Sequence, residues 1–291
     1  MSETSVSPVS VAKPNKHMEG NEYMKIGIIG VGHLGKAFIA GLVRSGIAQD
    51  RIILNARTME TLDSVKQIYP CINVTTDKKE LVAESDIIVI VVKSQNAGGV
   101  LTEIGEMDLS GKTFISFMAG ISLSDMREML RDTRREYRLI RMMPNLGISL
   151  CKGVIGVCCE NDPAETEEVL NLFRQLGYLI HLPEEKLESI TICAASGLAF
   201  AAYLMKEYRN SCDRLINDAV VSEEVTTRIF ENVIEIVRNE DKTFETLIEQ
   251  ISTKGGTTEA GISKLQDSNL SEIINQCIDT AYDRVNALKE K

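Results

Sequence analysis

The sequence predicts a doubly wound α/β domain with a mostly parallel sheet, followed by an all-helical domain. From residue 24 to residue 182, short aliphatic runs alternate with helical patterns. Such alternation is typical of parallel strands joined by helices that cover both faces of the sheet. Beyond that point the strand patterns stop, and helical periodicity continues to the end of the chain. We therefore expect one domain over residues 24–182 and a second over residues 183–291.

Composition and charge narrow the functional class. The chain has 291 residues, of which 44% are hydrophobic, so it can bury substantial cores. Its net charge is −10, and its lysines and arginines are interspersed among the acids. Because the sequence shows no basic stripe, we do not expect it to bind nucleic acid. The expected partner is a small molecule that local positive groups bind.

Cysteine usage and the N-terminal segment favour a cytoplasmic protein. Seven scattered cysteines without a CxxC motif, together with three histidines, support neither a disulfide framework nor a metal site. The sequence shows no apolar run of the roughly 20 residues that a membrane helix needs, so no membrane partner is expected. Residues 1–23 are rich in serine, proline and polar residues, and we expect them to form a disordered extension.

The segment Lys25–Gly46 predicts a strand, a glycine turn and a helix in direct succession. The turn carries the pattern GxGxxG, in which Gly30 permits a tight turn and Gly32 lets the backbone approach a diphosphate. Gly35 lets the helix pack closely on the strand. The negative diphosphate would lie against free N–H groups at the helix N-terminus. These features indicate a dinucleotide-binding Rossmann fold, and a plain strand-to-helix turn is the alternative.

The end of the second predicted strand indicates which dinucleotide binds. Residues 51–54 are followed by Asn55-Ala56-Arg57-Thr58, where NAD-binding proteins of this fold usually have an acid for the ribose hydroxyls. This stretch contains no carboxylate, whereas Arg57 and Thr58 could bind a 2′-phosphate. We therefore expect NADPH as the cofactor, with NADH as the second choice. The alternative is that Arg57 is an ordinary solvated residue.

The other strands of the sheet predict the remaining contacts with the cofactor. Residues 86–92 contain six consecutive aliphatics, which is typical of a strand buried on both faces. Lys93 and Ser94 follow at the carboxyl end, where open α/β sheets bind ligands; a solvated strand end is the alternative for Lys93. The strand 113–117 leads into Met118-Ala119-Gly120, whose small residues would let a nicotinamide lie close to the backbone. Further strands are expected at 72–75, 138–142, 153–158 and 178–181, and further helices at 59–69, 78–84, 123–130 and from Pro163.

The second domain is predicted to be helical throughout. A long pattern over residues 188–208 carries an alanine-rich stripe, which suits close helix packing or a subunit interface. A glycine loop, Ser252–Thr258, lies between later helices, and its consecutive N–H groups could bind a small carboxylate with the hydroxyls of Thr257 and Thr258. A helix cap is the alternative for this loop. The later helices are expected at 222–237, 244–251 and 270–288.

Taken together, these motifs resemble those of the pyrroline-5-carboxylate reductase family over residues 24–290. The matching segments follow the family's order and spacing, and they read IGIIGVGHLG, VVK at a strand end, SFMAGIS, RMMPN and STKGGTTEAGISKLQ. The resemblance implies reduction of the cyclic imine 1-pyrroline-5-carboxylate to L-proline with NAD(P)H. It also implies a Rossmann domain followed by an all-α C-terminal dimerisation domain, which forms an intertwined homodimer or a higher oligomer.

The resemblance also implies roles for individual residues. The substrate carboxylate would bind at Gly256, Thr257 and Thr258, with Glu185 and Gln250 closing the site. Thr258 is the residue that we expect in catalysis; a dedicated general acid is not needed when the imine is already protonated. The cofactor positions would be Gly30, Val31, Gly32, His33 and Leu34 on the diphosphate, with Gly35 packing beneath, Arg57 and Thr58 near the adenosine phosphate, Lys93 and Ser94 beside the ribose, and Met118 and Ala119 beside the nicotinamide.

The departures from the family's pattern fall mostly in the substrate half. Residues 195–200 read ASGLAF where the family has glycine-serine-glycine-proline-alanine-tyrosine, and Lys254 replaces a proline. Three alternatives stay open: a related cyclic imine as substrate, a cofactor-binding homologue with altered catalysis, and a β-hydroxyacid dehydrogenase. The last would use a lysine on the long helix, where Lys206 and Asn210 form a KxxxN pair. However, Lys206 lies nine residues after Gly197, which is too far for that family's usual spacing.

Overall fold

The computed structural model describes residues 24–131, 136–160 and 163–289, so the extension expected at residues 1–23 lies outside the described residues. Strands and helices alternate in the first domain, with 3₁₀ turns at Gln49–Arg51, Ser94–Asn96 and Leu146–Leu150. The strands are β1 (Ile26–Ile29), β2 (Ile52–Asn55), β3 (Asn73–Thr75), β4 (Ile87–Ile90), β5 (Thr113–Ser116), β6 (Arg138–Pro144), β7 (Gly153–Cys159) and β8 (Gly177–His181). The helices are α1 (His33–Arg44), α2 (Met59–Lys66), α3 (Lys78–Glu84), α4 (Ala97–Gly105), α5 (Leu123–Leu130) and α6 (Pro163–Arg174).

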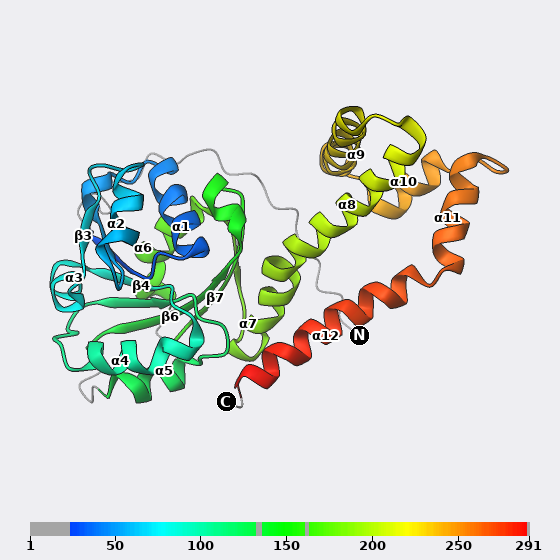
Figure 1. The fold of residues 1–291 in the computed structure, drawn as a ribbon. Helices are drawn as coiled ribbons and strands as arrows, with labels where there is room; N and C mark the ends of the chain where they lie inside the picture. Colours follow the sequence, from blue (N-terminus) through cyan, green and yellow to red (C-terminus); the bar gives the residue numbers. More distant parts are fainter. Residues whose placement is uncertain (1–23, 132–135, 161–162, 290–291) are drawn as a thin grey trace.

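All of these strands join one sheet in the order β3-β2-β1-β4-β5-β6-β7-β8. Neighbouring strands are parallel except β6 and β7, which are antiparallel. The strand order reverses between β1 and β4, which creates the switch point at which such sheets bind ligands. Figure 1 shows the sheet between two layers of helices. This is the doubly wound, mostly parallel architecture that the sequence predicts.

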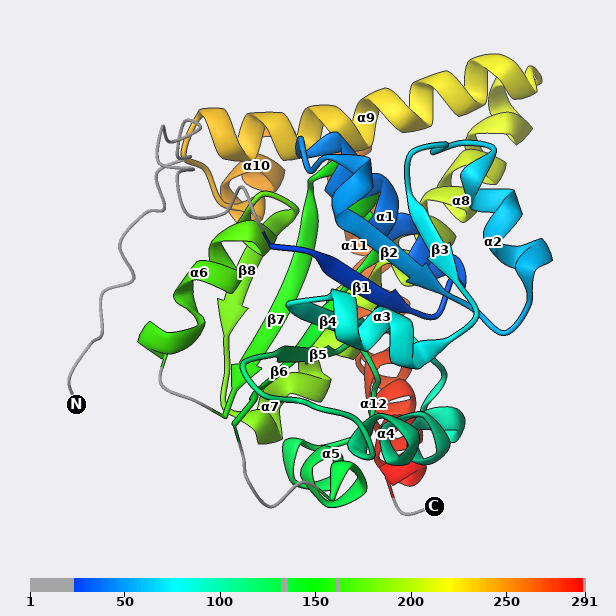
Figure 2. The same cartoon turned by 90° about the vertical axis from the view of Figure 1, so that its left-hand side faces the viewer.

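Burial on both faces of the sheet explains its aliphatic strands. Every residue of β1, β2 and β4 is buried. On one face α1, α2 and α6 pack against the sheet, and the aromatic rings of Phe38 and Phe173 stack there. On the other face α3, α4 and α5 bury Leu101 and Met126 (Figure 2). These two cores hold the carboxyl ends of the strands in fixed register.

The first helical run of the second domain is longer than the sequence pattern indicates. α7 (Glu184–Ile190), a π-helical segment (Thr191–Ser196) and α8 (Gly197–Ile216) follow one another without a break. The pattern over residues 188–208 marks only the middle of this 33-residue run, because polar residues occupy both of its ends. By length and composition alone, the run is apolar enough to cross a membrane.

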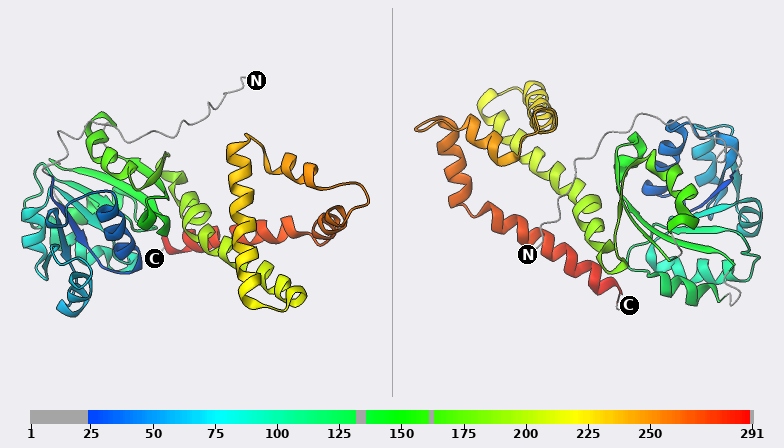
Figure 3. Two further views of the ribbon diagram at one scale, coloured as in Figure 1. Left: turned by 90° about the horizontal axis from the view of Figure 1, so that it is seen from above. Right: turned by 180° about the vertical axis from the view of Figure 1, so that it is seen from behind.

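Residues 197–289 form a helical arm that leaves the sheet along α8 and returns along α12 (Leu270–Lys289) (Figure 1). Two further views show the same out-and-back path (Figure 3). At its base α12 packs against α7 and the π-helical segment. The outer part contains α9 (Ala219–Asn239), α10 (Phe244–Ile251) and α11 (Thr257–Asp267). Among the described side chains of the helical arm, the buried ones are Ser222, Thr226, Leu247 and Val285.

Candidate functional site

The glycine turn after β1 lies at the switch point of the sheet, and its shape requires two glycines. Gly30 has a φ of +107°, and a Cβ on it would lie 2.4 Å from the carbonyl oxygen of Val91. A Cβ on Gly35 would lie 2.4 Å from the carbonyl oxygen of Gly30. Both distances are too short for any side chain. The turn therefore packs as the GxGxxG pattern requires.

Gly32 differs from these two glycines because it faces open space. It is exposed, and a Cβ built on it would meet nothing within 4 Å in this chain. Gly32 is also the N-cap of α1, whose first turn contains no acid and whose N-terminal amides receive no side-chain cap. Free amide donors at a helix N-terminus bind anions. The space above Gly32, His33 and Leu34 therefore fits the diphosphate of a dinucleotide.

Arg57 and Thr58 lie beside the glycine turn. The amide of Gly30 donates to the carbonyl oxygen of Asn55 at 3.0 Å, and the buried Asn55 side chain donates to the carbonyl of Thr75 at 3.1 Å. Arg57 and Thr58 follow Asn55 at the exposed start of α2. Within the described part of the chain, Arg57 forms no ion pair. Its guanidinium is therefore available for a phosphate next to the ribose position.

Two further strand ends complete this edge of the sheet. The amide of Val91 donates to Ile29 at 2.8 Å, so Lys93 and Ser94 emerge next to the glycine turn. The Ser94 hydroxyl donates to the carbonyl oxygen of Ala119 at 2.5 Å. The Met118 side chain is buried in the core, so only its backbone reaches this edge. Together the ends of β2, β1, β4 and β5 form what we call the cofactor cradle, defined by residues 30–35, 57–58, 93–94 and 118–119.

The predicted substrate residues do not meet within one chain. Glu185 is exposed in the first turn of α7, close to the sheet. Gln250 lies on α10, where its side-chain oxygen accepts from the Lys242 ammonium at 2.6 Å. Thr257 and Thr258 begin α11, in the outer part of the helical arm (Figures 1 and 3). A single chain therefore brings together the residues predicted to bind the cofactor and leaves the residues predicted to bind the substrate separated.

The glycine loop between α10 and α11 already uses part of its hydrogen-bonding capacity. The Gly255 amide donates to a carboxylate oxygen of Glu259 at 2.6 Å, and the Gly256 amide donates to the Thr253 carbonyl at 2.9 Å. Among the described residues, the hydroxyls of Thr257 and Thr258 have no hydrogen-bond partner. The two threonines, together with the first amides of α11, are therefore the donors that remain for a carboxylate.

A buried charge cluster beside the cradle was not expected from the sequence. Arg141 on β6 donates to Glu184 at 2.8 Å and to Glu188 at 2.7 Å. The Arg141 and Glu188 side chains are 3% and 0% exposed. The signal was present, because Arg141 interrupts the apolar run of residues 139–144 and the two acids lie four residues apart on a helix. A buried arginine requires such partners.

Asn145 links the end of β6 to the π-helical segment. Its side-chain amide donates to the carbonyl oxygen of Ala194 at 3.2 Å, and its side-chain oxygen accepts from the amides of Gly147 and Val154. The asparagine of the RMMPN motif therefore satisfies a carbonyl group in the widened helical turn. This turn overlaps residues 195–200, where the sequence departs from the family's pattern.

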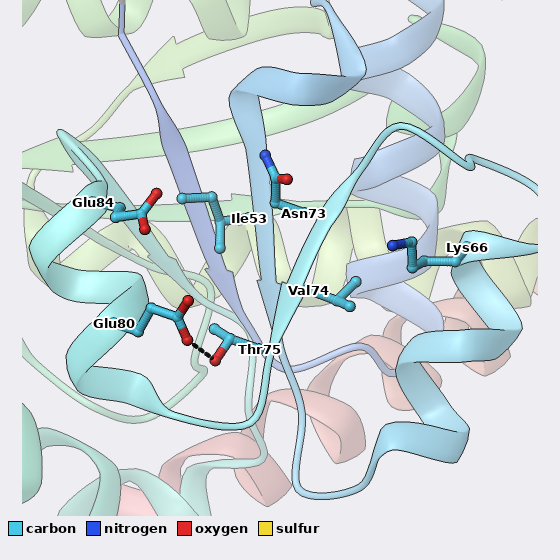
Figure 4. A pocket seen from close by; sticks show the side chains of 7 residues that line it. All are labelled: Ile53, Lys66, Asn73, Val74, Thr75, Glu80 and Glu84. Carbon is cyan, nitrogen blue, oxygen red and sulfur yellow. Dashed lines mark hydrogen bonds between the residues drawn. The ribbon is translucent and has the colours of Figure 1, made fainter.

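A separate cavity of about 200 Å³ lies at the β3 edge of the sheet (Figure 4). In this cavity the Thr75 hydroxyl donates to Glu80 at 2.5 Å, and the Glu84 carboxylate lies on the same helix. None of the residues of the cofactor cradle lines the cavity. The lining consists of Ile53, Lys66, Asn73, Val74, Thr75, Glu80 and Glu84.

Two family models match the chain, one on each side of the domain junction. Residues 25–120 match the family described as NADP oxidoreductase coenzyme F420-dependent. Residues 184–288 match the family described as pyrroline-5-carboxylate reductase dimerisation.

Relatives and solved structures extend this match along the chain. The protein is 26% identical over 274 residues to pyrroline-5-carboxylate reductase 2 of Bacillus subtilis, an alignment that covers 92% of this chain and 96% of that protein. Its fold resembles that of a Plasmodium falciparum pyrroline carboxylate reductase with NADP bound, at a TM-score of 0.82 and 21% identity, covering 92% and 99% of the two chains. A Coxiella burnetii pyrroline-5-carboxylate reductase gives a TM-score of 0.80 at 23% identity, with coverage of 92% and 99%. The chain is therefore similar to pyrroline-5-carboxylate reductases along most of its length, and its helical domain matches their dimerisation family.

Proposed function

We propose that the protein reduces 1-pyrroline-5-carboxylate to L-proline with NADPH, in the cytoplasm and as a homodimer. The observation that carries this proposal is the cofactor cradle, with open space above Gly32, in a chain that matches these reductases over 92% of its length. The exposed Arg57 favours NADPH over NADH, because its guanidinium can pair with a 2′-phosphate. We expect neither nucleic acid nor a membrane as a partner.

The residues of the chain would act mainly by positioning. Bound NADPH supplies the hydride that the imine carbon accepts. The N-terminus of α1 would hold the diphosphate, and the backbone at Met118 and Ala119 would lie against the nicotinamide. Thr257 and Thr258 would hold the substrate carboxylate. Because a protonated imine is already electrophilic and already carries its proton on nitrogen, alignment of the two reactants is the main requirement.

A second copy of the chain would supply the missing half of the site. The helical arm exposes large apolar side chains, among them Leu204 at 45%, Phe244 at 52% and Ile273 at 58%. An arm with so few buried residues gains little stability by itself, so a partner arm is needed to cover these side chains. In an intertwined dimer, the glycine loop of one chain would lie over the cofactor cradle of the other. The match to the dimerisation family over residues 184–288 supports this arrangement.

One assay tests the proposal. Purified full-length protein is mixed with NADPH or NADH and pyrroline-5-carboxylate, and absorbance loss at the nicotinamide band is followed. We expect turnover with both cofactors and a higher kcat/KM with NADPH. Calorimetry that finds no binding of either reduced cofactor would overturn the proposal. Cofactor binding without consumption of the imine would instead identify a homologue with altered catalysis.

A related cyclic imine is the second candidate substrate. The observation in its favour is the π-helical segment at Thr191–Ser196, which widens the helix where residues 195–200 differ from the family. A wider turn changes the wall available to a substrate ring. Piperideine carboxylate, compared with pyrroline-5-carboxylate in the same assay, distinguishes the two substrates. Oxidation of 3-hydroxy acids with NADP⁺ would indicate a β-hydroxyacid dehydrogenase instead.

A further inference from the structure

The buried charge cluster formed by Arg141, Glu184 and Glu188 also holds the loop that follows β5. Oε1 of Glu188 accepts from the Gly120 amide at 3.1 Å as well as from Arg141. Oε1 of Glu184 accepts from the Leu123 amide at 2.7 Å as well as from Arg141. One arginine therefore orients two carboxylates, and each carboxylate binds one end of the 120–123 loop segment.

The peptide group between Ala119 and Gly120 is held from both sides. Its oxygen accepts from the Ser94 hydroxyl at 2.5 Å, and its N–H donates to Glu188 at 3.1 Å. Gly120 adopts a φ of +75°, a conformation that favours glycine. The orientation of this peptide is therefore set by two side chains, one from the 3₁₀ turn that follows β4 and one from α7. The peptide lies at the nicotinamide end of the cofactor cradle.

Close packing of α7 on the sheet holds Glu188 in place. A Cβ on Gly156 of β7 would lie 3.0 Å from a methyl carbon of Leu187 and 3.1 Å from Ile190, so the glycine allows the helix to approach. The other carboxylate oxygen of Glu188 accepts from the Thr191 hydroxyl at 3.3 Å, at the start of the π-helical segment. The carboxylate thus has a donor at both oxygens.

Stability alone does not account for a buried cluster of this kind. Transfer of an arginine and a carboxylate out of water is costly, and apolar residues of similar volume are often equally or more stabilising. A buried carboxylate that accepts from the backbone does, however, fix the direction of a peptide group, which an apolar residue cannot do. The arrangement therefore favours a positioning role.

We infer that Glu188, oriented by Arg141, is a positioning residue for hydride transfer because it locks the Ala119–Gly120 peptide against which the nicotinamide ring would lie. This inference rests on the proposed function. Loss of the lock would let the ring and the imine carbon move out of alignment. A misplacement of about 1 Å can lower the rate of a positioned reaction by roughly 100-fold.

The test uses the Glu188→Leu variant and the double variant Arg141→Met/Glu188→Leu. The double variant removes both charges of the Arg141–Glu188 pair, so neither charge is left buried without the other. We expect kcat to fall by roughly 10- to 100-fold, while the Kd for NADPH changes by less than about threefold because the diphosphate site is intact. With NADPH deuterated at the transferred position, the isotope effect on kcat should rise. Glu188→Gln should restore part of kcat, because its amide oxygen can still accept from Gly120.

A matched control separates positioning from loss of an ion pair. Glu160 accepts from Arg127 at 2.8 Å in a partly exposed pair, and in the described part of the chain neither side chain forms a hydrogen bond with residues 120–123. Glu160→Gln should therefore leave kcat and the isotope effect unchanged. A folded double variant with the kcat and isotope effect of the original protein would overturn the inference. If the original protein binds NADPH but reduces no imine, the proposed function is wrong, and the inference about Glu188 is tested by hydrogen exchange instead.

The exchange rate of the Gly120 amide is then measured in the cofactor-free protein. Protection of this amide from exchange that persists in the double variant overturns the inference, and protection that is lost supports it.

Discussion

The Cβ position of Gly30 lies 2.4 Å from the carbonyl oxygen of Val91, so the backbone at the end of β1 packs directly against the backbone at the end of β4. Gly32 has no such neighbour. The two glycines therefore have different roles. Gly30 is required by the chain itself, whereas we expect Gly32 to be required by the ligand.

The two alanine variants should differ accordingly. Gly30→Ala should lower Tm and abolish NADPH binding, because its φ of +107° and the Val91 contact exclude a side chain. Gly32→Ala should keep Tm but raise the Kd for NADPH at least about tenfold, because the methyl group displaces the diphosphate. Thermal unfolding and calorimetry measure the two effects. Gly261→Ala, in open space on α11, is the control, and equal loss of binding in all three variants would contradict this assignment.

Arg57 should determine the choice between the two cofactors. Arg57→Ala should lower kcat/KM for NADPH by roughly 10- to 100-fold, because a charge-assisted hydrogen bond contributes about 1.5–3 kcal/mol. The value for NADH should change little, because NADH lacks the 2′-phosphate. Lys79→Ala removes another exposed cation, on α3, and serves as the control. A parallel loss with both cofactors would assign Arg57 to another role.

Thr258 should affect the substrate and not the cofactor. Thr258→Ala should weaken binding of the imine by about 1–3 kcal/mol, because a hydroxyl donor to a buried carboxylate is lost. The KM for pyrroline-5-carboxylate should therefore rise while the Kd for NADPH is unchanged. Thr258→Ser, which keeps the hydroxyl, should restore most of the affinity. An unchanged KM in the alanine variant would remove Thr258 from this role.

The helical arm should be stable only when it is paired. Leu204→Glu introduces a charge where a leucine on α8 is 45% exposed in the single chain, and it should shift the dimer toward monomer and abolish turnover. Burial of a leucine side chain in the interface stabilises the dimer by about 1.5–3 kcal/mol per copy. Sedimentation analysis over a range of concentrations measures the shift. Ile68→Glu, at an exposed position on the sheet domain, should leave the dimer intact; a dimer that survives Leu204→Glu would exclude this face of α8 from the interface.

Cys158 should contribute to the dependence of stability on pH. Burial, with a smaller contribution from the nearby Glu184 charge, raises the pKa of the Cys158 thiol from 9.0 to about 11. Since the folded state keeps the proton to a higher pH than the unfolded state, the free energy of unfolding should fall between about pH 9 and pH 11. Thermal unfolding of Cys158→Ala should show a weaker fall over this window. Cys71→Ala, at an exposed cysteine, should follow the original protein.

The sequence predicts the sheet and the cofactor cradle well because both depend on local patterns. A parallel strand buried on both faces is a continuous aliphatic run, and the glycine spacing of a dinucleotide turn is contained within six residues, Gly30 to Gly35. The positions of Arg57, Lys93 and Ala119 follow from the same rule, because the carboxyl ends of neighbouring parallel strands meet at one edge of the sheet. Their roles in binding NADPH stay a prediction.

The sequence by itself therefore determined the alternating architecture, the helical second half and the turn that suits a diphosphate. Only the tertiary structure decided that Arg141 meets Glu188, which lies 47 residues further along the chain, and that the Thr257–Thr258 pair lies far from the cradle of its own chain. The physical reason is the range of the interactions. Hydrophobic periodicity and glycine geometry act between neighbours in the sequence, whereas the partner of a buried charge and the path of a helical arm depend on how complete elements pack.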